Sequence, residues 1–318
     1  RHYDATGAIS QPIYFSATFR HPAFHQSTGY DYGRVANPTR DQLELTVASL
    51  EQGQRCWALS SGMAAINMVL HLFQPGDHLL LSEDLYGGTV RLADEVYSGY
   101  GITFDYVDTA DTAAVASKIR PNTRGIFIET PSNPMMRVSD IVALAALAHD
   151  HQSLLIVDNT FLSPHFQKPL TLGADIVVHS ATKYLGGHND LLAGAVVTNN
   201  KALGEQLAFQ LNTAGGTLDA FDCWLLVRGM KTLPLRMKQH QANAQAVVAY
   251  LESEKLIKSV YYPGKGGMLS FTLHDKATIP VVLDALNIFT FAESLGGVES
   301  LITYPTTQTH ADIPIEVR

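Results

Sequence analysis

The feature of the sequence that most constrains the fold is a series of six short apolar segments separated by stretches with helical periodicity. The apolar segments lie at residues 78–82, 102–107, 125–129, 154–158, 176–179 and 194–198. The helices between them are predicted at residues 63–73, 89–98, 111–119 and 140–151. Apolar strands that alternate with helices are typical of a mostly parallel sheet buried on both faces, so we expect an α/β fold.

The region before this alternation predicts a different kind of structure. Residues 1–40 are rich in Gly, Pro and aromatic side chains and lack clear periodicity, which predicts an extended arm without a core of its own. A helix is predicted at residues 41–52, with Asp41 as its N-cap and Gly53 directly after its end. We expect residues 41–232 to form the large domain.

The chain changes character again after the last apolar segment. Helices are predicted at residues 201–213, 233–254 and 279–287, and strand-like pieces at residues 260–262 and 267–273. This mixture predicts a smaller α+β domain over residues 233–318. The sequence stops just after a helix-opening signal, Asp312-Ile313-Pro314, so we expect this domain to be incomplete as given.

Composition and charge exclude several classes of function. The formal net charge is −8, whereas a nucleic-acid-binding face needs clustered basic residues. No apolar run reaches the roughly 18 residues that span a bilayer, and residues 1–10 lack the apolar core of a signal peptide. No HExxH motif is present, so we expect no metal site. Two cysteines, Cys56 and Cys223, give no disulfide framework and fit a reducing cytoplasm.

A lysine close to the end of a predicted strand is the strongest sign of chemistry. Lys183 closes the run Ser180-Ala181-Thr182-Lys183, directly after the strand predicted at residues 176–179. A lysine there can form a Schiff base with an aldehyde cofactor, and the hydroxyl groups of Ser180 and Thr182 can bind its phosphate. Taken alone, the run also fits a surface lysine on a loop.

A carboxylate at a second strand end makes the cofactor interpretation more specific. Asp158 ends the strand predicted at residues 154–158, and a carboxylate there can keep the ring nitrogen of pyridoxal-5′-phosphate (PLP) protonated. Taken alone, Asp158 also fits a turn or helix cap. The combination of strand-Asp with strand-Ser-x-Thr-Lys favours PLP over either separate interpretation.

Two glycine-containing turns support the same interpretation. Ser60-Ser61-Gly62-Met63 opens a predicted helix, where free backbone N–H groups can bind a phosphate. Tyr86-Gly87-Gly88 places an aromatic ring next to two glycines, where the ring can lie flat on a planar cofactor. Each turn alone is weak, because many helices begin with Ser-Gly and many turns carry a surface tyrosine. The absence of GxGxxG after the first strand argues against a nicotinamide oxidoreductase.

Seven motifs in order along the chain resemble those of one enzyme family. They are YGRVANPT, SSGMAAI, LYGGT, ETPSNP, VDNTF, SATKYLGGHND and ESLGGVESLITYP. The set is similar to the Cys/Met-metabolism family of PLP enzymes, which comprises cystathionine γ-synthase, the cystathionine lyases and the O-acylhomoserine sulfhydrylases. The resemblance implies the PLP-dependent transferase fold of type I, like that of aspartate aminotransferase, with a mostly parallel seven-stranded sheet and a smaller C-terminal α+β domain.

The resemblance also implies roles for individual residues. The catalytic group would be Lys183, Tyr86 and Asp158, which respectively resemble the Schiff-base lysine, the ring-stacking tyrosine and the pyridinium partner. The phosphate contacts would be Ser61, Gly62, Met63, Ser180 and Thr182. Tyr32 and Arg34 are similar to a pair that reaches the phosphate of a neighbouring subunit, which implies a shared active site in a dimer of dimers. Asn133 and Ser294 match residues near the substrate carboxylate. The family's carboxylate-binding arginine lies in a later segment, LRxSxGxE, that this sequence does not contain, so that residue stays unassigned.

A few outer residues bear on which family member the chain resembles. Arg91 can pair with a distal carboxylate or acyl group of the substrate, or it can be a solvated helix arginine. Glu299 resembles a glutamate of γ-acting members, and Leu295 stands where β-lyases tend to carry tryptophan. We therefore expect a PLP-dependent cystathionine γ-synthase with O-acetylhomoserine sulfhydrylase activity, acting in cytoplasmic trans-sulfuration. Cystathionine γ-lyase, β-lyase and a PLP-binding protein without turnover remain as alternatives.

Overall fold

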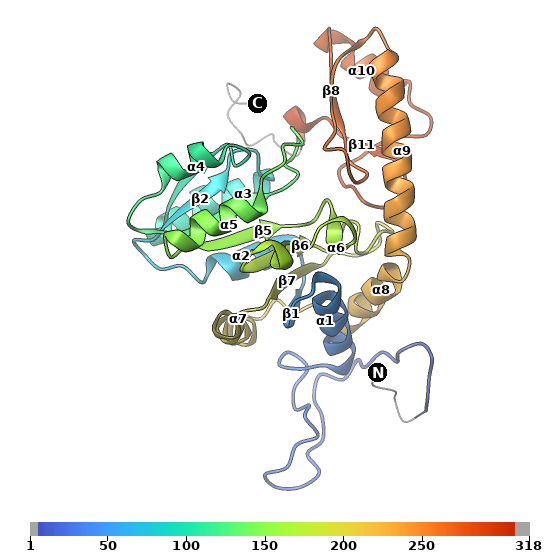
Figure 1. The fold of residues 1–318 in the computed structure, drawn as a ribbon. Coiled ribbons are helices and arrows are strands. Elements are labelled where there is room, and N and C mark those ends of the chain that lie inside the picture. The colour runs from blue at the N-terminus through green and yellow to red at the C-terminus, as the bar shows by residue number, and fades with distance from the viewer. Residues whose placement is uncertain (1–5, 309–318) are drawn as a thin grey trace.

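A seven-stranded sheet forms the centre of the computed structural model, which describes residues 6–308 (Figure 1). Its strands run in the order β1-β7-β6-β5-β4-β2-β3. Only β7 is antiparallel to its neighbours β1 and β6, and the other pairs are parallel. The strands are β1 (Arg55–Leu59), β2 (His78–Ser82), β3 (Thr103–Val107), β4 (Thr123–Glu129), β5 (Leu154–Asp158), β6 (Ile176–Ser180) and β7 (Gly194–Thr198). The α/β prediction and the seven-stranded, mostly parallel sheet are confirmed.

Helices cover both faces of this sheet. They are α1 (Pro38–Glu51), α2 (Gly62–Leu70), α3 (Gly87–Arg91), α4 (Thr112–Lys118), α5 (Ile141–Asp150), α6 (Ser163–Phe166), α7 (Lys201–Ala214), α8 (Ala220–Met230), α9 (Leu233–Ser253) and α10 (Ile279–Asp284). A π-helical turn, Leu92–Tyr97, continues α3. Alternate strand residues point to opposite faces, so Leu79 and Leu81 pack with α2 and α7, whereas Leu80 packs with α4 and α5. A third cluster of buried side chains joins the other end of the sheet to α1, α8 and the start of α9.

The predicted start and end of the first helix were wrong. The helix begins at Pro38, and Asn37 rather than Asp41 is its N-cap, because the Asn37 side chain accepts hydrogen bonds from the N–H groups of Thr39 and Arg40. Pro38 suits the first helical position because its φ angle is fixed and it has no N–H to satisfy. The helix ends at Glu51, two residues before Gly53, and its C-cap Gln52 adopts the left-handed conformation.

The chain on either side of the sheet forms an arm and a peripheral unit. Residues 6–35 are mostly exposed and extend away from the sheet at the bottom of Figure 1. Helix α9 leads to two small sheets, formed by β8 (Ile257–Tyr261) with β9 (Ser270–Leu273) and by β10 (Thr290–Phe291) with β11 (Leu301–Ile302). The first turns of α9 are buried against the main core, and the domain boundaries stay a proposal. The signal at Asp312 lies outside the described residues.

Three polar residues lie side by side at the carboxyl ends of the neighbouring parallel strands β4, β5 and β6. Glu129 at the end of β4 is in register with Asp158 at the end of β5, and Ser180 ends β6 beside them. In open sheets of this kind ligands bind outside the carboxyl ends of the strands. Within residues 6–308, no helix has both the length and the apolar character needed to cross a bilayer.

Candidate active site at the carboxyl edge of the sheet

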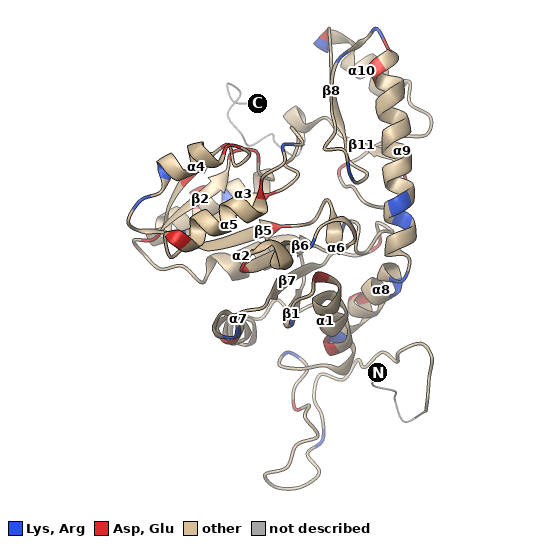
Figure 2. Cartoon of the chain, viewed as in Figure 1, with Lys and Arg blue, Asp and Glu red and all other residues tan. Residues whose placement is uncertain are grey.

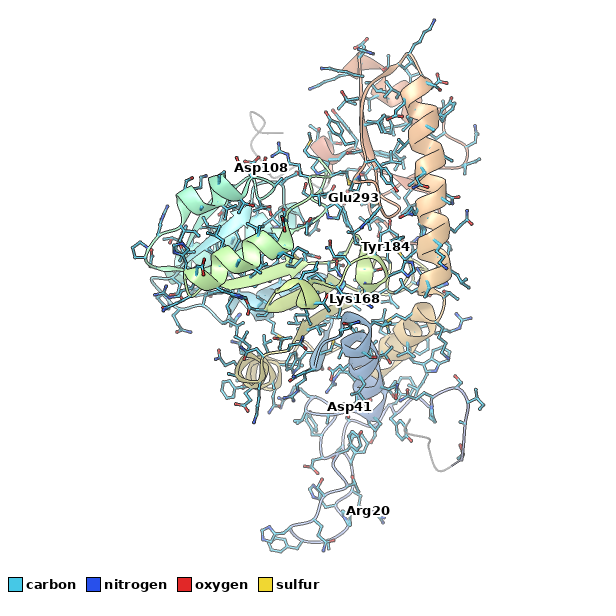
Figure 3. The ribbon with its side chains drawn as sticks, in the orientation of Figure 1. Arg20, Asp41, Asp108, Lys168, Tyr184 and Glu293 are labelled. Atoms are coloured by element: carbon cyan, nitrogen blue, oxygen red, sulfur yellow. The ribbon has the colours of Figure 1, made fainter. Side chains whose placement is uncertain are left out.

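Lys183 lies just after the end of β6, in a tight turn of the backbone. Its N–H donates to the carbonyl oxygen of Ser180 over 3.2 Å, and its carbonyl oxygen accepts from the N–H of Gly187 over 2.8 Å. The side-chain Nζ donates to Oγ of Ser294 over 3.0 Å. Figure 3 labels Tyr184 and Glu293, the sequence neighbours of this pair. Burial lowers the pKa of Lys183, so a larger fraction of the amine is neutral at a given pH than in water.

Asp158 is buried and held by the residue two positions later. Its Oδ1 accepts from the N–H of Thr160 over 3.0 Å and from Oγ1 of Thr160 over 2.5 Å. The same Thr160 hydroxyl accepts from the N–H of Ser180 over 2.9 Å, so Thr160 ties the ends of β5 and β6 together. Burial raises the pKa of Asp158, while both hydrogen bonds from Thr160 oppose that shift.

Glu129 is a second buried carboxyl group next to Asp158. Burial and the Asp158 charge raise the pKa of Glu129 well above its usual range. Glu129 Oε2 accepts one hydrogen bond, from the N–H of Tyr86 over 3.2 Å, whereas Asp158 accepts two from Thr160. Two adjacent buried carboxylates repel each other, and the better hydrogen-bonded one keeps its charge more easily. We infer that Glu129 is the neutral member of the pair and Asp158 the anionic one.

The start of α2 meets the end of β6 to form a cradle for an anion. Ser61 is the N-cap of α2, and its Oγ accepts from the N–H of Ala64 over 3.1 Å. The N–H groups of Gly62 and Met63 in the first turn have no acceptor within the helix. A Cβ atom at Gly62 would lie 2.8 Å from Cβ and 2.9 Å from Oγ of Ser180, so only glycine allows this approach. A phosphate fits such a helix N-terminus with a hydroxyl beside it.

Thr182 faces the start of β7. Its Oγ1 accepts from the N–H of Ala193 over 3.0 Å and donates to the carbonyl oxygen of Ala193 over 3.2 Å. These two bonds fix the turn between Ser180 and Lys183 against β7. The hydroxyl predicted to bind phosphate is therefore also a structural link within the chain.

Tyr86 and Met63 lie beside each other at the same edge. A Cβ at Gly88 would lie 2.5 Å from Cε1 of Tyr86 and 3.1 Å from Sδ of Met63, so both side chains border the backbone of Gly88. The Tyr86 side chain is 43% exposed, and its ring is available to a ligand. The predicted ring-stacking residue and the predicted phosphate cradle therefore adjoin.

The predicted substrate residues lie on three different segments. Ser294 contacts Lys183, and the backbone of Gly296 packs on the Lys183–Tyr184 peptide, since a Cβ there would lie 2.5 Å from the Tyr184 nitrogen. Glu299 Oε2 accepts from Nδ2 of Asn189 over 2.6 Å. Asn133 is partly buried in the loop after β4, and Arg91 is the last residue of α3.

The arm residues Tyr32 and Arg34 make their contacts elsewhere in this chain. The guanidinium of Arg34 lies over the Tyr32 ring, 5.5 Å from its centroid. Nη1 of Arg34 also donates to the backbone oxygen of Asn212 and, over 3.0 Å, to its Oδ1, near the end of α7. Within one chain the structure therefore does not bring this pair to the Lys183 turn.

Sequence reasoning missed two residues that shape the site. Glu129 stands at a strand end like Asp158, and Thr160 follows Asp158 by two residues, but the sequence assigned neither of them a role in the site. The signal for Glu129 was its place at the carboxyl end of an apolar strand, like that of Asp158 at the end of the next strand along the chain. A hydroxyl two residues after a buried aspartate was the signal for Thr160.

Comparisons with known proteins agree with this geometry. The family model described as Cys/Met metabolism PLP-dependent enzyme matches residues 1–318. The cystathionine gamma-synthase/O-acetylhomoserine (thiol)-lyase of Bacillus subtilis is 56% identical over 99% of this chain and 84% of its own length. The cystathionine gamma-lyase of the same organism is 49% identical over 99% of this chain and 87% of its own length.

A solved structure shows the same fold. The crystal structure of a cystathionine gamma-lyase from Lactobacillus plantarum, complexed with L-serine, superimposes with a TM-score of 0.96 at 46% sequence identity. The superposition covers 99% of this chain and 87% of that one. The family match over the whole chain and these identities, taken with the lysine, carboxylate and anion cradle at one sheet edge, establish the assignment. This chain is an enzyme of the Cys/Met metabolism family of PLP-dependent enzymes.

Proposed function

We propose that this chain catalyses γ-replacement on an O-acylhomoserine, as a cystathionine γ-synthase with O-acetylhomoserine sulfhydrylase activity. The net reaction breaks the Cγ–O bond of the ester, forms a Cγ–S bond with a thiol or sulfide, and releases the acyl group as a carboxylic acid. The observation that carries this choice is the 56% identity to a relative named for both activities, against 49% to one named as a γ-lyase.

The residues present fit PLP. The phosphate would bind at Ser61, Gly62, Met63 and the hydroxyls of Ser180 and Thr182. Lys183 would bond the aldehyde carbon, Asp158 would hold the proton on the ring nitrogen, and Tyr86 would cover the ring. The fit rests on the close approach of the Gly62 backbone to Ser180, which a Cβ atom at residue 62 would prevent. This approach brings the backbone N–H groups at the start of α2 next to the Ser180 hydroxyl, where both can bind one phosphate.

PLP, when bound, supplies an electron sink that stabilises negative charge on the substrate carbon next to the amine. Lys183 would then move protons at the substrate carbons. Burial lowers the pKa of its Nζ, so the amine can accept a proton closer to neutral pH. Ser294 accepts a hydrogen bond from this nitrogen and holds it in one orientation. Tyr86 would lie beside the same reacting atoms.

Four residues would contact the rest of the substrate. Asn133 and Ser294 would bind near its α-carboxylate, and Arg91 and Glu299 would lie toward its distal end. Glu299 accepts a hydrogen bond from Asn189, which follows Lys183 by six positions. This bond connects the residue proposed to lie at the distal end of the substrate to the segment that carries Lys183. This link supports a role for Glu299 in selecting substrates that react at the γ-carbon.

We also propose that the active site is completed by a second copy of the chain, within a dimer of dimers. The arm residues 6–35 are mostly exposed. Arg34 contacts α7 and lies over the Tyr32 ring, so both side chains make their contacts away from the Lys183 turn. A neighbouring copy would receive these two side chains at its phosphate cradle. A cytoplasmic location is consistent with Cys56 and Cys223, which are both free thiols.

The test is to identify the products formed from defined substrates. O-acetylhomoserine is supplied with cysteine, with sulfide and alone, and cystathionine is supplied separately. The proposal predicts cystathionine from the first mixture and homocysteine from the second. The Lys183→Ala variant is the control for reactions that do not need the enzyme.

The same experiment separates the remaining candidate. The 49% identity to a γ-lyase favours cystathionine γ-lyase as the second candidate. Rapid release of ammonia and α-ketobutyrate from cystathionine, with no thioether formed from O-acetylhomoserine, would replace the proposed function by that one.

A further inference from the structure

The loop that carries Asn133 is closed on itself by backbone contacts. The N–H of Ser132 donates to the carbonyl oxygen of Arg137 over 2.9 Å, and the N–H of Arg137 donates to Oγ of Ser132 over 3.0 Å. The N–H of Met136 donates to the carbonyl oxygen of Ser132 over 3.2 Å. Asn133 is therefore part of a four-residue loop whose base is the Ser132–Arg137 pair.

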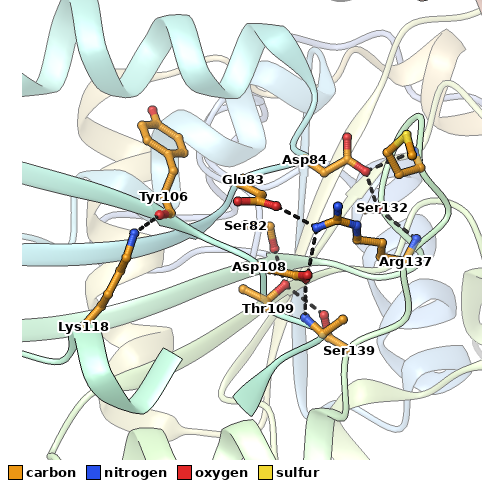
Figure 4. A network of polar contacts seen from close by, with 12 residues as sticks. Ser82, Glu83, Asp84, Tyr106, Asp108, Thr109, Lys118, Ser132, Arg137 and Ser139 are labelled. Carbon is orange, nitrogen blue, oxygen red and sulfur yellow. Dashed lines mark hydrogen bonds and ion pairs between the residues drawn. The ribbon is translucent and has the colours of Figure 1, made fainter. Parts of the chain in front are cut away.

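One carboxylate outside this loop holds it on both sides of Asn133. Asp84 Oδ2 accepts from Oγ of Ser132 over 2.6 Å and from the N–H of Met135 over 3.0 Å (Figure 4). Ser132 is 3% exposed, so the first of these bonds is shielded from water. Hydrogen bonds to an ionised carboxylate are stronger than neutral ones, and Asp84 makes two.

Asp84 belongs to the same short segment as Tyr86. This segment follows β2 and is tied back to the end of β4, because Glu129 Oε2 accepts from the N–H of Tyr86. Two carboxyl groups thus cross-link the two loops in opposite directions. Asp84 reaches from the Tyr86 segment to the Asn133 loop, and Glu129 reaches from the base of the Asn133 loop to Tyr86.

The Asn133 loop also contacts the peripheral unit. Oγ of Ser270, in β9, donates to the carbonyl oxygen of Pro134. The loop is therefore placed by Asp84 on one side and by β9 on the other. Of these two contacts, only the one from Asp84 connects Asn133 to the segment that bears Tyr86.

The neighbouring ion pairs cannot replace this link. Arg137 Nη1 lies 2.6 Å from Glu83 and 2.8 Å from Asp108, but the three side chains are 37–47% exposed. Exposed ion pairs contribute little because water and salt screen them. Figure 2 shows acidic residues gathered near α3 and α4. Of Glu83, Asp84 and Asp108, only Asp84 bonds to both flanks of Asn133.

We propose that Asp84 is a positioning residue that fixes Asn133 relative to Tyr86 and thereby sets the affinity for the amino-acid substrate. This proposal deepens the proposed function, since it rests on Asn133 lying near the substrate carboxylate. It predicts an effect on the KM for the amino acid, with no effect on PLP binding. Tyr86 keeps its bond to Glu129 when Asp84 is removed, and no bond of Asp84 reaches the Gly62–Ser180 cradle.

The test compares Asp84→Ala with Glu83→Ala in the full-chain holoenzyme. These adjacent residues are both acidic, and only the first bonds to the flanks of Asn133. For Asp84→Ala we expect KM for the amino-acid substrate to rise about tenfold or more, with kcat within about twofold and the PLP affinity unchanged. Glu83→Ala should keep the KM of the wild type.

Two further variants test the same link. Ser132→Ala removes one of the two bonds to Asp84, together with the bond that Ser132 Oγ accepts from the N–H of Arg137, and it should raise KM. Asp84→Asn keeps an acceptor oxygen but no charge, and it should restore part of the affinity. If Asp84→Ala fails to fold, these two variants decide the question.

Several outcomes would overturn the proposal. An unchanged KM in Asp84→Ala, or in both Asp84→Asn and Ser132→Ala, would do so, as would an equal rise in Glu83→Ala. A loss of PLP in parallel with KM would show a general structural role instead. The KM ratio is measured with whichever amino acid the wild type consumes. If the proposed function were wrong, the products of the wild type would differ from those predicted. If the Asp84 proposal were wrong, the ratio of the variant KM to the wild-type KM would stay near one.

Discussion

The Gly62→Ala substitution is expected to weaken PLP binding by opening the phosphate cradle. The added methyl group would lie 2.8 Å from Cβ of Ser180, whereas ordinary van der Waals contact begins at 3.4 Å. The start of α2 and the end of β6 would therefore have to separate by about 0.6 Å, since packed interiors have no spare volume. Both elements are proposed to bind the same phosphate.

The magnitude follows from overpacking alone, because the helix propensity of alanine is the same in the apo and the PLP-bound protein and cancels in the Kd. Overpacking of this kind costs about 1–3 kcal/mol. The apo protein can relax by separating the two elements, but PLP draws them together again. This cost of about 1–3 kcal/mol should therefore appear in PLP binding, as a Kd about 5- to 150-fold higher.

The assay is a titration of apo protein with PLP, followed by its absorbance. Gly99→Ala is the matched control, because a Cβ at Gly99 would meet no atom within 4 Å. Gly99→Ala should bind PLP like the wild type. If Gly62→Ala also bound PLP with the wild-type Kd, the cradle would have been placed wrongly.

Two further predictions concern the fold around the site. Burial raises the pKa of Glu44 from 4.5 to about 7, so the folded chain holds this proton more tightly than the unfolded chain. The free energy of unfolding should therefore fall by about 3 kcal/mol as the pH rises from about 4.5 to about 7, and the loss should be complete above that range. Urea unfolding at several pH values should show this slope in the wild type but not in Glu44→Gln, and an equal slope in both would refute the assignment. Gly296 and Gly264 have φ angles of +81° and +80°, but only a Cβ at Gly296 would meet the backbone of Tyr184. Gly296→Ala should therefore lower Tm more than Gly264→Ala, and equal losses would contradict the packing on the Lys183 turn.

The central sheet was predictable from the sequence, except for one strand. Six strands lie in short segments rich in apolar residues, and most of these strands are buried on both faces. Asp105 interrupts the apolar run of β3, which is an edge strand and only partly buried. Strand β1 was missed because it opens with Arg55 and lies between two stronger helical patterns. It forms by pairing with β7, some 140 residues later, and local periodicity does not report such a contact.

The start of α1 was predicted wrongly for a local reason. Apolar periodicity begins at Leu43, so the helix was placed from Asp41, but the Asn37-Pro38 pair starts it one turn earlier. A cap with a proline after it outweighs periodicity at a helix end.

The candidate site was predictable in its chemistry but not in its supports. Lys183 and Asp158 could be proposed because each follows an apolar run and because a Schiff-base cofactor needs such a pair. Thr160, Glu129 and Asp84 were not found, because their roles depend on strand register and loop closure. Such contacts join segments that are separate in the sequence.

The covalent attachment of PLP tests the central claim most directly. The holoenzyme is reduced with borohydride, digested, and the modified peptide is identified by mass spectrometry. The account predicts a single pyridoxyl label on Lys183 and no label in the Lys183→Ala variant. A label on another lysine of the wild type, or no label at all, would contradict it.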